Sequence, residues 1–160
     1  MIDSMFVQGF RDVRKKQFKV IRRMLEHGLD EMGWRHRRLR KRNHYFLRTQ
    51  GRHNPYEIFA VKDGKMTHVS VHTRIRSSLY RRQLQEYLDC LNKNSVSGSF
   101  EIEKSGDLAY MHTLYRDFSE QRLQRQLRDA LLRMDRHIRI IVRVGYDGSM
   151  TAQEAIRFER

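Results

Sequence analysis

The sequence predicts an α+β fold: a single antiparallel sheet of about five strands with helices packed on it, in the order α-βββ-α-ββ-α-α. Hydrophobic residues recur with helical spacing in three long segments, and they alternate with a period of two in short segments between them. Two turn signals, Asp63-Gly64 and Ser105-Gly106-Asp107, join neighbouring short segments into hairpins. Two hairpins from separated parts of a chain indicate one antiparallel sheet that buries a face against helices.

Residues 10–32 have the pattern of an amphipathic helix. Its apolar side chains fall on one broad side at 100° per residue, and its basic side carries Arg11, Lys15, Lys19, Arg22 and Arg23. Either Gly28 or Gly33 is expected to end the helix, because glycine readily takes the left-handed conformation of a C-cap.

Three short strands are expected next, at Tyr45–Leu47, Tyr56–Val61 and Met66–His72. A second helix then follows Ser77 and Ser78, which are candidate N-caps. Its apolar face consists of Tyr80, Leu84, Tyr87, Leu88 and Leu91. The second hairpin is expected from strands at residues 100–103 and 108–111.

A third helix is predicted to open at Ser119. Residues 138–144 fit both a strand, because they are rich in β-branched side chains, and a helix, because Ile138 and Ile141 continue the helical stripe. We favour a helix that runs to Gly145. A short helix over roughly 152–158 follows the capping box from Thr151 to Glu154.

The composition indicates one domain over residues 1–160 with a strong positive charge. The formal net charge is +14, and residues 1–53 hold 15 Lys and Arg against 5 Asp and Glu. Cys90 is the only cysteine, which points to a reducing compartment, and we expect a cytoplasmic protein without a signal peptide or a transmembrane segment. A charge of this size indicates association with an anionic partner. The candidates are nucleic acid, an anionic membrane surface and an acidic protein.

Residues 79–158 resemble the YbjN-like family, whose fold is similar to that of type III secretion chaperones. The resemblance rests on Asn92 and Asn94, on the segments 98–103 and 106–110, on the run from Met134 to Gly145, and on residues 149–156. Family members are described as regulators or chaperone-like proteins, and no catalytic residues carry over. The resemblance therefore implies a protein partner and a homodimer.

Residues that suggest catalysis or metal binding are few. The sequence has no glycine-rich phosphate loop, zinc-ligand spacing or nucleophile elbow, so we predict no enzyme, no cofactor and no metal. His68 and His72 would lie about 13 Å apart on one solvated face of a strand, too far to share a metal. Cys90 is expected to be a small buried hydrophobe, and Glu101 and Glu103 are expected to point to solvent.

The densest basic run, residues 35–42, is the main candidate for a binding site. Six Lys or Arg in eight residues repel one another unless an anion compensates them, and arginine pairs bidentately with phosphate. The alternative is a soluble connector into the first strand. The candidate anion-binding set is Arg35, Arg37, Arg38, Arg40, Lys41 and Arg42, helped by Lys15, Lys19, Arg22, Arg23 and Tyr45. Tyr45, Phe46 and Tyr56 are candidates to stack on exposed bases.

Four hypotheses follow. The leading one is a chaperone-like or regulatory adaptor that binds a protein, which predicts a sizeable exposed apolar patch. The second is a sequence-tolerant nucleic-acid-binding protein that uses the basic run, which predicts a steep dependence of affinity on salt. An enzyme with a pocket built from distant residues ranks last. A membrane-surface role for the helix at 10–32 also stays open.

Overall fold

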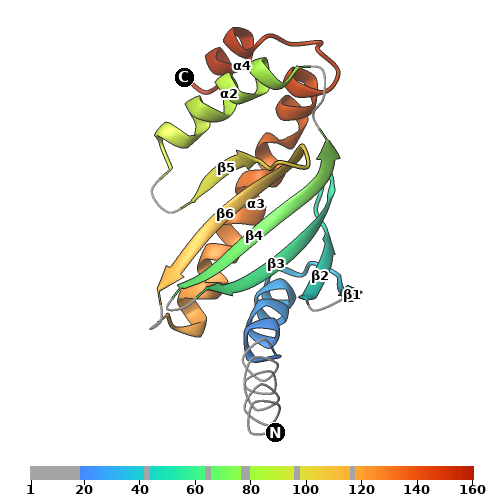
Figure 1. The fold of residues 1–160 in the computed structure, drawn as a ribbon, viewed down its shortest axis with the longest axis vertical. Helices are drawn as coiled ribbons and strands as arrows, with labels where there is room; N and C mark the ends of the chain where they lie inside the picture. The colour runs from blue at the N-terminus through green and yellow to red at the C-terminus, as the bar shows by residue number, and fades with distance from the viewer. Residues whose placement is uncertain (1–18, 42–43, 64–65, 77–79, 96–97, 116–117) are drawn as a thin grey trace, which may run out of the picture.

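The computed structural model describes residues 19–41, 44–63, 66–76, 80–95, 98–115 and 118–160 (Figure 1). In these residues six strands form one antiparallel sheet in the order β1-β2-β3-β4-β6-β5. The strands are β1 (His36–Lys41), β2 (His44–Gln50), β3 (Pro55–Asp63), β4 (Met66–Arg76), β5 (Ser99–Ile102) and β6 (Asp107–Tyr115). The helices are residues 19–32 (the N-terminal helix), α2 (Arg81–Lys93), α3 (Glu120–Gly145) and α4 (Ala152–Phe158). The predicted α+β class, with helices on an antiparallel sheet, is confirmed.

One strand was missing from the prediction. His36–Lys41 is β1 and not a connector, and it pairs with β2 from His36 opposite Thr49 to Lys41 opposite His44. The observed order is therefore α-ββββ-α-ββ-α-α. The sequence signal was hidden because β1 is an edge strand, where Lys and Arg are common since they discourage pairing with another chain.

The core lies between the sheet and the helices. Five buried side chains form a row across neighbouring strands on one face, and each is at most 2% exposed: Leu47, Ile58, Val71, Tyr110 and Phe100. Helix α3 runs behind this face of the sheet in Figure 1, and α2 and α4 pack around its second half.

Helix α3 settles the two interpretations of residues 138–144. It begins directly after Ser119, its N-cap, and continues to Gly145. The Ser119 hydroxyl accepts a 3.1 Å hydrogen bond from the Arg122 amide. Ile138, Ile141 and Val144 are buried with helical spacing, so the β-branched run extends the apolar stripe. Packing therefore outweighs the strand propensity of these residues.

The other helix ends agree only in part with prediction. The N-terminal helix stops at Gly33, which has a φ of 71°, and the Trp34 amide bonds to the Leu29 carbonyl at 3.0 Å. Tyr80 is the N-cap of α2, while the predicted caps Ser77 and Ser78 lie outside the described residues. The Thr151 hydroxyl accepts a bond from the Glu154 amide, which is one of the two bonds of the predicted capping box. No helix in the described part of the chain is long and apolar enough to cross a membrane.

Candidate nucleic-acid interface

In the described part of the predicted basic run, neighbouring arginines lie on opposite faces of the sheet. Because side chains alternate along a strand, Arg38 shares the face of its partner Leu47, toward the N-terminal helix, whereas Arg37 shares the opposite face with its partner Arg48. Arg40 and Lys41 lie in β1 opposite Tyr45 and His44. The strand thus divides the charge between two faces of the sheet.

Carboxylates of the N-terminal helix already neutralise part of this charge. Glu26 accepts two bonds from the Arg38 guanidinium, at 2.7 and 3.2 Å, and lies 3.3 Å from Nε of Arg22. The hydrogen bond from Arg38 lowers the pKa of Glu26. His36 lies 2.7 Å from the Asp30 carboxylate. Of the basic run, Arg38 is therefore neutralised within the fold, whereas Arg35 and Arg37 are exposed.

The remaining predicted residues are dispersed. Lys19 and Arg23 are exposed on the N-terminal helix, and Arg35 and Arg37 are exposed around the start of β1. Lys15 and Arg42 lie outside the described residues. Tyr56 is fully buried and stacks on Trp34, so the prediction that it stacks on a base is wrong.

A different set of arginines lies together on the outer surface of α3. We call Arg125, Arg128, Arg136, Arg139 and Arg143 the arginine ridge. All five are exposed, and at 100° per residue they fall within about 80° of arc. From Arg125 to Arg143 the helix rises about 27 Å. The ridge is opposite the buried stripe that the sequence had revealed.

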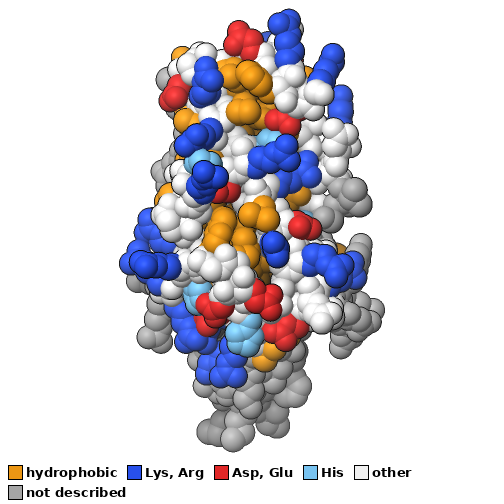
Figure 2. Space-filling model, turned by 180° about the vertical axis from the view of Figure 1, so that it is seen from behind, with side chains coloured by type: hydrophobic (Ala, Val, Ile, Leu, Met, Phe, Trp, Pro, Cys, Tyr) orange, Lys and Arg blue, Asp and Glu red, His pale blue; other side chains and the backbone are white. Residues whose placement is uncertain are grey.

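No ion pair among the described residues neutralises a ridge arginine. Asp129 borders the ridge and is exposed, but it is not within ion-pair distance of any ridge guanidinium in the part of the chain that is described. Arg143 donates a long hydrogen bond of 3.4 Å to the Ser149 hydroxyl, which carries no charge. Figure 2 shows Lys and Arg spread over the height of this side of the molecule, with Asp and Glu side chains among them.

Asp135 fixes the position of α3 beside the turn between β2 and β3. Its carboxylate accepts hydrogen bonds from the Arg52 amide at 2.9 Å, the His53 amide at 3.1 Å and the Tyr56 hydroxyl at 2.7 Å. A Cβ at Gly51 would lie 2.7 Å from the same carboxylate, so glycine permits this close approach. Arg52 is exposed, and the turn that carries it is thus held against α3.

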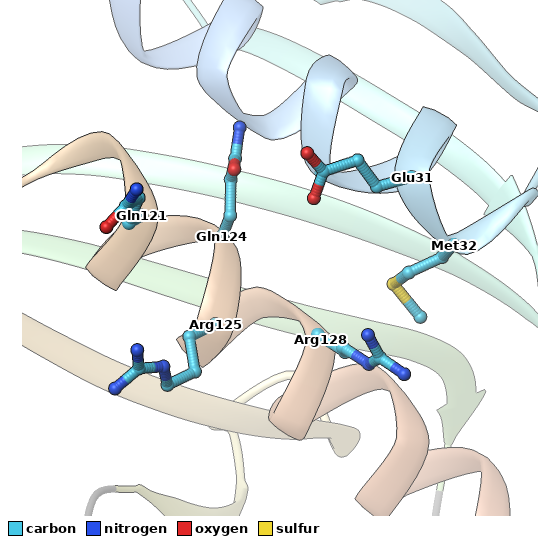
Figure 3. Close-up of a pocket in the computed structure, with 7 residues that line it drawn as sticks. Glu31, Met32, Gln121, Gln124, Arg125 and Arg128 are labelled. Carbon is cyan, nitrogen blue, oxygen red and sulfur yellow. The ribbon is translucent and has the colours of Figure 1, made fainter.

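A shallow groove of about 480 Å³ lies at the first turns of the ridge (Figure 3). The N-terminal helix and α3 approach closely there, since a Cβ at Gly28 would be 3.3 Å from Gln124 Cγ. One wall is formed by Gly28, Glu31 and Met32, and the other by Gln121, Gln124, Arg125 and Arg128. The groove therefore holds the Glu31 carboxylate and two glutamine side chains beside two ridge arginines.

On the sheet face away from α3, the side chains of Ser70, His72 and Glu103 lie next to one another. Nε2 of His72 lies 2.7 Å from the Ser70 hydroxyl, and Nδ1 lies 3.7 Å from the Glu103 carboxylate. The order resembles a Ser-His-acid triad. However, Ser70 and His72 are only 7% and 9% exposed, and β4 pairs with a strand on both sides. Its backbone amides are thereby committed to the sheet and do not stabilise an oxyanion.

Several predictions about single residues need correction. His72 is buried and not solvated: the centroid of its ring lies 4.4 Å from the centroid of the Phe59 ring. Burial lowers the pKa of His72. Cys90 is half-buried and not part of the core. Glu101 is exposed as predicted, while Glu103 lies beside His72. No group of three or more possible metal ligands occurs among the residues that the structure describes.

Comparisons with known proteins concern the fold alone. No family model matches the chain. No curated protein matches either. The crystal structure of YbjN from E. coli, a candidate transcription regulator, is similar over 71% of this chain and 85% of its own, with a TM-score of 0.48 and 12% identity. It belongs to the family that the sequence resembles.

The spacing of the ridge arginines is a signal of the ridge that the sequence contains. The five arginines are separated by 3, 8, 3 and 4 residues, which places them on one side of a helix. The signal needs one continuous helix through Gly145, and residues 138–144 also fitted a strand. The low net charge of the second two-thirds of the chain concealed it as well.

Proposed function

We propose that the protein binds the phosphate backbone of nucleic acid through the arginine ridge, without catalysing a reaction. The observation that carries this proposal is the line of five exposed arginines on α3, none of which forms an ion pair with a described carboxylate. Each guanidinium presents a planar fork of donors that matches phosphate oxygens, and it keeps its charge at any physiological pH. The proposed site differs from the basic run at residues 35–42.

A merely solvated surface is the competing explanation of the ridge. Like charges three or four residues apart on a helix destabilise it by a few tenths of a kcal/mol each. The ridge has such spacings at Arg125–Arg128, Arg136–Arg139 and Arg139–Arg143, and the bordering Asp129 forms no ion pair with them among the described residues. A polyanion removes this repulsion, and each neutralised phosphate releases a counterion.

The adaptor hypothesis has less support in the described surface. Its exposed large hydrophobic residues are Val20, Tyr80, Leu132 and Phe158, and each belongs to or precedes a different helix. They do not form a run along one element, although Figure 2 shows hydrophobic side chains gathered in two areas of one face. A protein partner and a homodimer stay predictions from the family resemblance.

The test is fluorescence anisotropy of a labelled duplex across a salt series from about 50 to 200 mM. The variant Arg136→Gln/Arg139→Gln removes two ridge charges, and Lys93→Gln/Lys104→Gln is the matched control, because it removes two exposed charges outside α3. We expect the ridge variant to bind all sequences more weakly and to lower the log–log salt slope by about 1.8.

The control variant should keep both the affinity and the slope. Equal losses in the two variants would show that net charge alone attracts the duplex and would reject the ridge as the site. Absence of wild-type binding at near-physiological salt would reject the proposed function.

A further inference from the structure

The arginine ridge is interrupted at its centre. Arg125 and Arg128 form one group, and Arg136, Arg139 and Arg143 form another. The eight residues from Arg128 to Arg136 correspond to about 12 Å along the helix axis. Leu132 lies in the middle of this gap and is 45% exposed. Positive charge is therefore presented in two clusters with an apolar side chain between them.

The gap corresponds to a dimension of B-form DNA. Its major groove is about 12 Å wide and separates two rows of phosphates. With α3 laid across the groove, Arg125 and Arg128 reach one row, and the second group reaches the other. A single strand offers one continuous row of phosphates, to which an interrupted ridge has no special complementarity.

The neighbours of α3 keep it from entering the groove. The N-terminal helix contacts its first half at Gln124, and the β2–β3 turn is bonded to Asp135. Because these elements flank the helix, its ridge meets the backbone, and the exposed side chains of Leu132 and Asp129 lie in the gap that faces the groove. Binding of this kind reads the spacing of the two phosphate rows and not the edges of the bases.

Other nucleic acids fit the ridge less well. Sequence-tolerant single-strand binding relies on aromatic rings that stack on bases. The exposed large hydrophobic residue on α3 is Leu132, which has no ring, within the part of the helix that is described. Double-stranded RNA has a deep and narrow major groove, so the phosphate rows across that groove do not match the 12 Å gap, and an RNA duplex probe tests its wide minor groove.

Building on the proposed function, we infer that the ridge selects B-form duplex DNA by spanning its major groove, with one arginine cluster on each phosphate backbone. Recognition is sequence-tolerant and depends on the position of the gap as well as on the total charge. The ligand class is thus double-stranded DNA in preference to single-stranded DNA and double-stranded RNA.

The test compares three labelled probes of one sequence, each roughly 20 nucleotides long per strand, or about two helical turns. They are a DNA duplex, an RNA duplex and a DNA single strand, measured by anisotropy at one salt concentration. We expect the DNA duplex to bind about tenfold more tightly than the other two, a discrimination of about 1.4 kcal/mol.

A charge-neutral variant tests the gap itself. Arg128→Gln/Leu132→Arg keeps five ridge arginines but moves one into the gap, and both positions are exposed. We expect it to retain binding to the single strand while its preference for the DNA duplex falls severalfold. Circular dichroism and a thermal melt verify that the variant is folded, and Arg128→Lys is the conservative control that should keep the preference.

The outcomes separate this inference from the proposed function. Equal affinity of the wild type for the three probes, or an unchanged preference in the gap variant, would overturn the duplex inference while leaving backbone binding intact. Failure of the wild type to bind any probe would overturn both.

Discussion

The hydroxyl of Tyr56 on β3 donates a 2.7 Å hydrogen bond to the carboxylate of Asp135 on α3. Both side chains are buried, and burial raises the pKa of Tyr56 well above its ordinary value, so the phenol stays protonated and continues to donate. The same carboxylate holds two backbone amides of the β2–β3 turn. One residue on the inner flank of α3 thus joins the ridge helix to the sheet.

Asp135→Asn should therefore destabilise the protein by about 2–3 kcal/mol, because a neutral amide accepts fewer and weaker hydrogen bonds from three donors. Urea denaturation measures the loss. Tyr56→Phe removes one of the three bonds and is the matched comparison, with an expected loss of about 1 kcal/mol. A loss in Asp135→Asn no greater than in Tyr56→Phe would mean that the turn amides do not depend on the carboxylate.

Glu26→Gln distinguishes the ridge from the basic run as the site of anion binding. The substitution removes the carboxylate that pairs with Arg38, whose side chain is 58% exposed, and therefore leaves the Arg38 guanidinium available to a polyanion. If the ridge alone binds, duplex affinity at moderate salt should change by less than about twofold. A severalfold increase, measured by anisotropy, would instead restore the β1 region as a binding surface. Glu101→Gln is the control, because Glu101 is an exposed carboxylate on β5.

Most of the architecture could be predicted from the sequence because it depends on local periodicity. The stripe that continues through Ile138 and Ile141 correctly predicted a helix to Gly145, and the Thr151 cap marked the start of α4. Strand β1 was missed since its six residues contain four Lys or Arg, and no burial pattern distinguishes a charged edge strand from a loop.

The candidate site was harder to predict because it depends on pairing between distant residues. Charge density singled out the basic run, but density says nothing about whether Glu26 will lie beside Arg38. The ridge, in contrast, has an ordinary density of charge along the sequence. It is defined by five arginines that lie on the same side of α3. The ridge can be predicted only if the helix is known to be continuous. That continuity depends on the packing of residues 138–144 against the core.

His137 should make folding stability sensitive to mild acid. Burial lowers its pKa, a change that the nearby Glu159 carboxylate opposes and Arg133 and Arg136 reinforce. The unfolded chain therefore binds a proton more readily, starting near the ordinary histidine pKa of about 6.5, and stability falls as the pH drops from there to the folded-state pKa. The loss is about 1.4 kcal/mol for each unit by which the pKa is lowered.

Urea denaturation of the wild type and of His137→Gln from pH 7 to pH 5 checks this expectation. The slope of stability against pH should be smaller in the variant, whatever its stability at pH 7. His72 is also buried with a lowered pKa, so the variant should keep a part of the slope. Identical slopes would show that His137 does not titrate differently in the folded and unfolded chains.

Asn92 covers the outer edge of β5, which is the edge strand at the other end of the sheet from β1. Its side-chain amide donates to the Phe100 carbonyl at 2.9 Å and accepts from the Phe100 amide at 2.7 Å, so one side chain occupies the backbone groups that another strand would use. Asn92→Ala should lower stability by about 1–3 kcal/mol for the two bonds. It should also increase light scattering on heating, because the freed edge can pair with another molecule.

The control for this prediction is Asn94→Ala, which changes an exposed residue two positions along the chain. Scattering should be compared at equal fractions of unfolded protein, so that lower stability alone does not account for a difference. If Asn92→Ala unfolds earlier but scatters no more than the control, the amide contributes hydrogen bonds and β5 needs no protection. Greater scattering would show that the two edges are guarded differently: β5 by one amide, and β1 by the charge of its Lys and Arg residues.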